Sequence, residues 1–157
     1  MLHWRWLVAL AAAVTAAAAS KTSGVDPVPY PEGYRHWVHV KSQLIGPGRS
    51  SHGLHHIYAN EQALLGYQTA RFPEGSVLVF DLLEVATADD VTVEGSRRHI
   101  DVMHKDSTRF ADTGGWGFEE FRGDSREPAL DAPARMRCLQ CHTKMEDRGL
   151  VFSAFRR

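Results

Sequence analysis

The feature that most limits what this chain can fold into is a group of two cysteines and a histidine near its C-terminus. Residues 138–142 read Cys-Leu-Gln-Cys-His, which is the C-x-x-C-H signature for attachment of c-type haem. Two thiols three residues apart can each add to one vinyl group of the same porphyrin, and the histidine after the second thiol then lies under the iron as its proximal ligand. We therefore predict one covalent haem c, bound by Cys138 and Cys141, with His142 as the metal ligand.

Two other functions of a C-x-x-C pair remain open from the sequence. Such a pair can hold zinc together with histidine, but Cys138, Cys141 and His142 cannot readily all coordinate one tetrahedral metal. A thioredoxin-like redox pair would open a helix after an early strand of a βαβ unit, whereas this motif lies about fifteen residues from the C-terminus. The chain has only two cysteines and both belong to the motif, which favours haem.

The N-terminus predicts export. Residues 1–6 carry one positive charge, and an alanine-rich apolar stretch and a small-x-small cleavage pattern at residues 17–19 follow. We predict a signal peptide over residues 1–20, a polar, proline-rich flexible leader over residues 21–29, and one domain over residues 30–157 in the bacterial periplasm. An uncleaved anchor is the alternative, although the apolar run is too short for a convincing membrane span. Export suits haem c, because its thioether bonds are made outside the bacterial cytoplasm.

The charge of the chain gives little indication of a macromolecular partner. Loss of residues 1–20 removes Arg5, so that 17 of the 18 basic residues remain against 19 acidic ones, a net charge near −2. Neither nucleic acid nor an anionic membrane surface is predicted as a partner. The remaining length is enough for one domain with one core.

The hydrophobic pattern predicts short strands with hairpin-length links, which imply an antiparallel sheet. The run over residues 76–83 is apolar on both faces, as expected of a central strand. Asn60 can cap a short helix over residues 61–67, and the haem motif is expected on a helix over residues 134–147. We therefore predict a mainly β, α+β fold with a few short helices and a haem-bearing C-terminal helix. The expected strands cover residues 53–59, 76–85, 97–104, 116–121 and 150–155.

The methionines argue against an ordinary electron-transfer cytochrome c, in which the motif lies near the N-terminus and a distant downstream methionine is the sixth ligand. Met145 is the only methionine after His142. It follows three residues later on the same predicted helix, so it cannot reach the far side of the iron. Met103 and Met136 lie upstream, and we expect them to fill the core. The four-helix cytochromes c′ also end in a C-x-x-C-H helix, but the β-branched runs of this chain do not suit a helical bundle.

Four segments, taken in order, resemble a known family. They are Tyr30–Trp37 (YPEGYRHW), Phe72–Val79 (FPEGSVLV), Val102–Phe110 (VMHKDSTRF) and Cys138–His142 (CLQCH). Together they are similar to the cytochrome P-460 family, which includes the β-sheet cytochromes called cytochromes c′-β, and the resemblance covers residues 30–156. It implies a mainly antiparallel β domain, a homodimer, His142 as the sole axial protein ligand and an open distal face.

The two branches of this family differ in function. Cytochromes P-460 oxidise hydroxylamine with a haem that is cross-linked to a lysine. Cytochromes c′-β lack the cross-link, have an apolar distal cap, and bind nitric oxide and carbon monoxide. The lysine of the first branch follows the F-x-x-G turn in the pattern V-x-V-K, and this sequence has Phe80 in that place. The resemblance therefore implies that Phe80 caps the distal side; without the resemblance, Phe80 reads as ordinary strand packing.

Two further residues match distal positions of the family. Asp101 falls where the enzymes have a pocket carboxylate, which could accept a proton from a bound amine or hold a water; the alternative is an exposed strand aspartate. His55 matches a basic pocket residue that could donate a hydrogen bond to a bound diatomic or ligate iron; the alternative is a surface histidine. The other histidines we expect to be solvated or one step removed from the haem, because their spacing forms no metal site. They are His36, His39, His52, His56, His99 and His104.

Two classes of function remain. The first is an exported mono-haem protein with an open distal site that binds nitric oxide or a similar small ligand, and the missing lysine favours it. The second is a P-460-type oxidoreductase that oxidises hydroxylamine, with Asp101 as a catalytic proton relay and a redox partner protein to take the electrons. A plain electron-transfer cytochrome is a third alternative, weakened by the lack of a sixth ligand.

Overall fold

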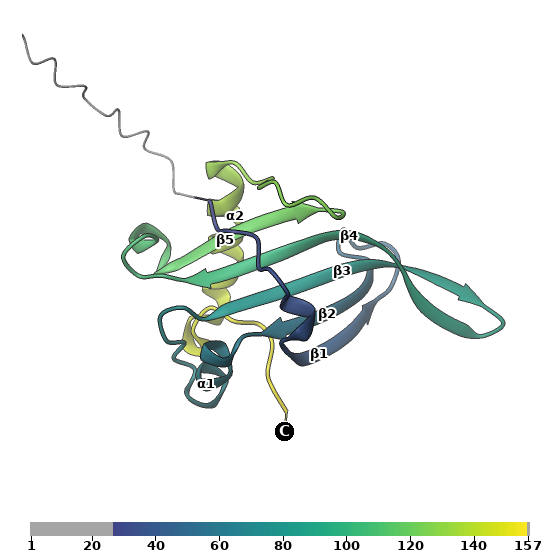
Figure 1. The fold of residues 1–157 in the computed structure, drawn as a ribbon, viewed down its shortest axis with the longest axis horizontal. Helices are drawn as coiled ribbons and strands as arrows, with labels where there is room; N and C mark the ends of the chain where they lie inside the picture. The colour runs from purple at the N-terminus through teal and green to yellow at the C-terminus, as the bar shows by residue number, and fades with distance from the viewer. Residues whose placement is uncertain (1–26, 157) are drawn as a thin grey trace, which may run out of the picture.

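The structure is a computed structural model, and it describes residues 27–156. Five strands form one antiparallel sheet in which strands that follow one another along the chain are also neighbours in space (Figure 1). The predicted α+β fold with an antiparallel sheet is therefore confirmed. The predicted signal peptide and most of the leader lie outside the described residues. The strands are β1 (Val38–Ile45), β2 (Gly53–Ala59), β3 (Val77–Ala88), β4 (Val91–Lys105) and β5 (Trp116–Arg122).

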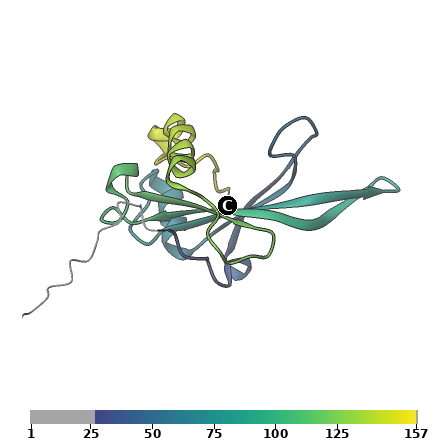
Figure 2. The same cartoon turned by 90° about the horizontal axis from the view of Figure 1, so that it is seen from above.

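The strands β3 and β4 form a long hairpin that projects beyond the rest of the sheet (Figures 1 and 2). Its turn consists of two residues, Asp89 and Asp90, with φ values of 50° and 62°. Positive φ at both central residues matches the right-handed twist of a two-residue hairpin, and aspartate tolerates this conformation better than most residues. Both strands are longer than predicted. The added residues lie at the hairpin end and are mostly exposed, so the apolar pattern does not mark them.

The edge strand β1 was not predicted. Its apolar alternation is broken at Val40, which lies in an irregularity of the register between His39 and Lys41. A bulge of this kind adds one residue to a strand and shifts all later side chains by one position in the sequence pattern. The strand therefore shows no clean period of two.

The two α-helices are α1 (Glu61–Thr69) and α2 (Ala132–His142). The Asn60 side chain accepts a hydrogen bond from Ala63 N and so caps α1, as predicted. Asp131 caps α2 in the same way, through Ala134 N. The helix that carries the haem motif ends at His142, earlier than predicted, and continues as a 3₁₀ segment. The three 3₁₀ segments are η1 (Tyr34–His36), η2 (Ala111–Thr113) and η3 (Thr143–Arg148). No helix among residues 27–156 is long and apolar enough to cross a membrane.

Residues 150–155 do not form the strand that was predicted for them. The carbonyl of Leu150 is hydrogen-bonded to His142, and the carbonyl of Ser153 accepts a hydrogen bond from Arg148. The hydroxyl of Ser153 also pairs with Tyr67. Side chains therefore hold backbone carbonyls that a sheet would have paired, and the segment lies beside α2 and η3 without regular secondary structure.

The two faces of the sheet carry separate cores, and α2 covers one of these faces (Figure 2). The face covered by α2, here called the helix face, contributes Leu78, Met103 and Phe118 to one core. The opposite face, here called the N-terminal face, contributes Val79 and Phe121, among others, to a second core that residues 28–34 cover. Alternate residues of each strand point to opposite faces, and the central strand β3 is buried on both, as its sequence predicted.

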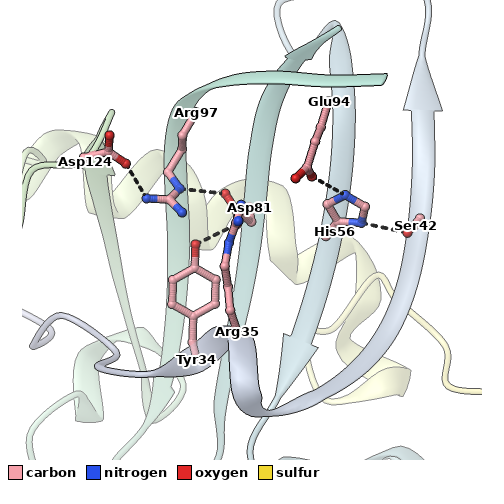
Figure 3. Close-up of polar contacts among 8 residues, drawn as sticks. All are labelled: Tyr34, Arg35, Ser42, His56, Asp81, Glu94, Arg97 and Asp124. Carbon is pink, nitrogen blue, oxygen red and sulfur yellow. Dashed lines mark hydrogen bonds and ion pairs between the residues drawn. The ribbon is translucent and has the colours of Figure 1, made fainter. Parts of the chain in front are cut away.

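A buried ionic cluster lies on the N-terminal face (Figure 3). The carboxylate of Asp81 is fully buried and accepts hydrogen bonds from the Tyr34 hydroxyl at 2.6 Å and from Arg35 at 3.0 and 3.1 Å. Arg97 donates a further bond to it at 3.0 Å and also pairs with Asp124. The cluster fixes η1 against the middle of the sheet.

Candidate functional site

The cysteines and the histidine of the motif all lie on α2. Residues three and four positions apart share one face of a helix, so Cys138, Cys141 and His142 point in a common direction. Both cysteines are free thiols; Cys138 is half-buried and Cys141 is exposed. Burial raises the pKa of Cys138 to about 11, so this side chain is a thiol at neutral pH.

Glu119 of β5 fixes the start of α2 relative to the sheet. Its side chain is fully buried and accepts hydrogen bonds from the backbone N–H groups of Ala129 and Leu130. Its second oxygen pairs with Arg135 of α2 at 2.5 Å. Glu119 was not predicted as a site residue, because a glutamate in an edge strand usually points to solvent. Only the folded chain shows that residues 129–135 pass over it.

The ring of His142 is held in one orientation. Its Nδ1 lies 2.7 Å from the carbonyl oxygen of Leu150, and a carbonyl can only accept, so Nδ1 carries the proton. Burial lowers the pKa of His142, so the ring is neutral at neutral pH. The rings of Phe118 and Phe152 pack against it with centroids 5.2 and 4.9 Å away. The lone pair of Nε2 is therefore available to a metal, as a haem ligand requires.

A cavity of about 390 Å³ opens beside the motif, between α2 and the strands β4 and β5. Its wall combines apolar side chains with the thiols and the imidazole of the motif. The residues that line it are Asp101, Val102, Met103, Phe118, Glu119, Leu130, Ala134, Arg137, Cys138, Cys141 and His142. Two free thiols and one oriented neutral imidazole lie beside a cavity with a largely apolar wall, and this combination fits a covalently bound haem.

The zinc alternative receives no support from this geometry. Across the described part of the chain, Cys138, Cys141 and His142 do not form a group whose ligand atoms lie within 4.8 Å of one another. A tetrahedral zinc holds its ligands about 3–4 Å apart. The three side chains share a helix face, but they are not arranged around a common point.

The three predicted distal residues all lie on the helix face. Phe80 of β3 is paired with Asp101 of β4, and both are partly exposed. The ring of His55, on β2, packs against Phe80 with a centroid separation of 4.4 Å. Asp101 lines the cavity beside the motif, whereas Phe80 and His55 lie further along the sheet. The fold therefore gathers these residues on the same side as the motif, and their roles toward a haem stay predictions.

The protonation of His55 limits what this residue can do. The side chain is fully buried, and its Nε2 lies 2.5 Å from the carbonyl oxygen of Ser51, so Nε2 carries the proton. Burial also lowers its pKa. Its Nδ1 is buried and has no hydrogen-bond partner among the described residues. In this form His55 can accept a hydrogen bond or bind a metal through Nδ1, but that nitrogen cannot donate the hydrogen bond that the sequence analysis considered.

His99, which was expected to be solvated or one step removed from the haem, is partly buried. It lies on the helix face with Asp101, and its Nε2 is 3.5 Å from the Asp101 carboxylate. The interaction with Asp101 raises the pKa of His99. Glu120 lies directly across from Asp101 on β5. The sequence could have shown that His99 and Asp101 are neighbours, because residues two apart in a strand point to the same face. It could not place Glu120 beside them, because that depends on the register between β4 and β5.

The positions of the lysines and methionines matter because a lysine could cross-link to a haem and a methionine could bind its iron. Lys41 pairs with Ile57 in the register, which places it on the helix face of the edge strand β1. Lys105 is bonded through its ammonium group to the Gly114 carbonyl. Met103 is buried in the helix-face core, and Met136 is exposed.

Comparisons with known proteins agree with this arrangement. The family model described as cytochrome P460 matches residues 31–153, and a comparison with curated proteins gave no match. The chain belongs to the cytochrome P460 family. It is therefore a haem protein of the kind that includes cytochromes P-460 and cytochromes c′-β.

Proposed function

We propose that this member of the cytochrome P460 family carries one haem c, attached by thioether bonds to Cys138 and Cys141, with His142 as the proximal iron ligand. The observation that carries the proposal is the 2.7 Å hydrogen bond between His142 Nδ1 and the Leu150 carbonyl. Metal-binding histidines commonly donate their second ring N–H to a carbonyl or carboxylate, which fixes the tautomer and the direction of the ring.

The chain prepares the proximal side for this ligand. When bound, the haem supplies an iron centre that can bind a small molecule or exchange an electron. Leu150 holds the His142 proton on Nδ1, and the rings of Phe118 and Phe152 pack against the imidazole. The segment after η3, which has no regular secondary structure, provides both Leu150 and Phe152.

We further propose that the distal side stays open and binds nitric oxide or a similar small neutral ligand, as in the cytochrome c′-β branch. Phe80 and Ile57 leave apolar surface partly exposed on the helix face. His55 presents a lone pair rather than a proton from Nδ1, so it does not stabilise a bound anion. Neutral diatomics need neither a charge partner nor a hydrogen-bond donor, and this surface suits them.

The electron-transfer alternative would require a methionine on the far side of the iron. Met103 lines the cavity, but it is the cross-strand neighbour of Phe118, whose ring packs on His142. A side chain beside the proximal histidine is poorly placed to reach the opposite axial position. Met136 is exposed on α2 itself.

Hydroxylamine oxidation is the second candidate, and Asp101 is the observation in its favour. This carboxylate is half-exposed and lines the cavity, where it could accept a proton from a bound amine. Against it, Phe80 occupies the lysine position of the P-460 branch and has no nucleophilic atom. A redox partner protein would also be required to remove the electrons.

Haem attachment is tested by acid–acetone extraction of protein produced with the c-type maturation machinery. We expect the haem to stay with the protein, and a haem that leaves with the solvent contradicts the proposal. The variant His142→Ala should keep both thioether bonds and lose the axial ligand.

Turnover of hydroxylamine with a dye acceptor, compared with titration with nitric oxide, separates the two functions. We expect binding of nitric oxide and no hydroxylamine turnover.

We also propose export to the bacterial periplasm and assembly as a homodimer, both supported by family membership. N-terminal sequencing of the secreted protein tests the predicted cleavage near residue 20. Sedimentation analysis of the haem-loaded protein tests the dimer.

A further inference from the structure

We propose that His99, Asp101 and Glu120 form a binding site for a divalent transition-metal ion, distinct from the haem iron, at the border of the cavity beside α2. One imidazole nitrogen and two carboxylate oxygens from these residues lie within 4.8 Å of one another. In the stretch from residue 27 to residue 156, this is the one group of three or more histidine, cysteine or acidic side chains that comes this close together. The proposal does not depend on which small molecule the haem binds.

The three side chains are placed by the sheet rather than by loops. His99 and Asp101 are two residues apart on β4, so they point to the same face. Glu120 is the register partner of Asp101 on β5. All three are partly buried. A site whose ligands stand on paired strands needs little ordering when the ion binds, and solvent can still reach it.

The distance between the first two ligands fits a metal better than a direct hydrogen bond. His99 Nε2 and the nearer Asp101 oxygen are 3.5 Å apart, whereas hydrogen bonds to oxygen are commonly about 2.7–3.2 Å long. Two ligands that each lie about 2.1 Å from a tetrahedral metal are about 3.4 Å from each other. The observed separation therefore leaves room for an ion between the two atoms.

The charges of the site favour a cation. Asp101 and Glu120 are like charges directly across an antiparallel pair, an arrangement that destabilises a sheet. Arg122 donates to Glu120 at 2.9 Å, but its side chain is 73% exposed and can turn away into solvent. A divalent ion would neutralise both carboxylates at once. One nitrogen and two oxygen ligands suit Zn²⁺ and its neighbours, whereas Mg²⁺ and Ca²⁺ prefer sites made of oxygen alone.

The test is calorimetric titration of the haem-loaded protein with Zn²⁺ after treatment with a chelator. Two variants remove one ligand each, His99→Ala and Glu120→Gln, and the second preserves the size of the side chain. His56→Ala is the matched control, because His56 lies beside another carboxylate, that of Glu94, on the N-terminal face (Figure 3). Circular dichroism of each variant confirms the fold.

We expect the unmodified protein to bind one Zn²⁺ at this site. Loss of partners that only orient ligands commonly costs about 10–100-fold in metal affinity, so loss of a ligand should cost at least as much in both site variants. The control should bind as the unmodified protein does. The proposal is overturned if the unmodified protein binds no Zn²⁺, if a folded Glu120→Gln variant binds it unchanged, or if the control loses it equally.

Discussion

Asp81 and Asp101 lie on adjacent strands but on opposite faces of the sheet, and their burial and hydrogen bonding differ. Asp81, on the N-terminal face, is fully buried and accepts hydrogen bonds from a tyrosine and two arginines (Figure 3). Asp101, on the helix face, is 49% exposed, and its ionic contact is with His99 at 3.5 Å. A carboxylate whose bonds are all satisfied inside the protein fixes the fold. A half-exposed carboxylate beside a cavity can still bind a metal ion or accept a proton from a ligand.

The largest expected difference between the faces is in stability. Asp81→Ala leaves the buried ends of Tyr34 and Arg97, and the partly exposed end of Arg35, without their partner. Loss of one member of a buried ion pair commonly costs about 3–5 kcal/mol. Asp101→Ala removes a half-exposed side chain, and we expect a change within about 1 kcal/mol. Urea unfolding of the two haem-loaded variants at neutral pH measures both values. Equal losses would show that the two faces do not differ as described.

A lysine placed on each face should give the next largest difference. Phe80 is partly exposed, so the stem of a lysine can lie along the helix face with its amine in solvent, and Phe80→Lys should cost about 1–3 kcal/mol. Val79→Lys is the matched control on the same strand. Val79 is fully buried on the N-terminal face, so this variant should lose more stability than Phe80→Lys.

The spectrum of Phe80→Lys then tests the position of Phe80 relative to the haem. The family resemblance implies that a lysine at this position can cross-link to the porphyrin, which shifts the absorption of the reduced protein to longer wavelength. We expect this shift in a fraction of the molecules, together with a change of intact mass. A folded variant with an ordinary c-haem spectrum would show that residue 80 does not face the ring.

The smallest expected effects are in the pH dependence of stability, where the two faces should have opposite signs. The interaction with Asp101 raises the pKa of His99 on the helix face, and burial lowers that of His104, which lies on the N-terminal face beside Phe110. The contribution of His99 is therefore complete below its unfolded pKa of about 6.5 and is lost as the pH rises through the folded value. The contribution of His104 is present above about 6.5 and is lost as the pH falls through its lower folded value.

The pH dependence of the free energy of unfolding is measured by urea unfolding in the presence of a chelator between pH 5 and 9. His99→Gln and His104→Gln are each compared with the unmodified protein. The deficit of the His99 variant should be greatest at the acid end, and that of the His104 variant should be greatest at neutral and alkaline pH. Each change over this range should be below about 1 kcal/mol. Deficits that change in the same direction for both variants would contradict the assigned environments.

The same contrast shows what the sequence could predict. The C-x-x-C-H motif, the capped helix after Asn60 and the buried central strand depend on local spacing, and the structure contains the helix and the strand where they were expected. The roles of Asp81 and Glu119 depend on segments far away in the chain that fold over them, so no local pattern marks either residue. The strand β1 escaped prediction because its bulge breaks the period of two.

The C-terminal segment failed for a further reason. Its apolar residues predicted a strand, but His142 and Arg148 occupy carbonyl groups that a sheet would have used. The sequence pattern records which residues are apolar, and it does not record which side chains compete for the backbone. In this protein the competing side chain is the predicted iron ligand, so the local error lies at the functional site.

The absorption spectrum of the purified protein, oxidised, reduced and with nitric oxide, shows whether the helix face holds a haem c with His142 on one side and an open position on the other. We predict a high-spin oxidised spectrum, the reduced spectrum of an ordinary c-haem, and a new spectrum when nitric oxide is added. A low-spin oxidised spectrum with a sulfur-to-iron band would show that Met103 or Met136 binds the iron. A reduced band shifted to longer wavelength would show that a lysine, with Lys41 as the first candidate, reaches the ring, and either result would contradict the account.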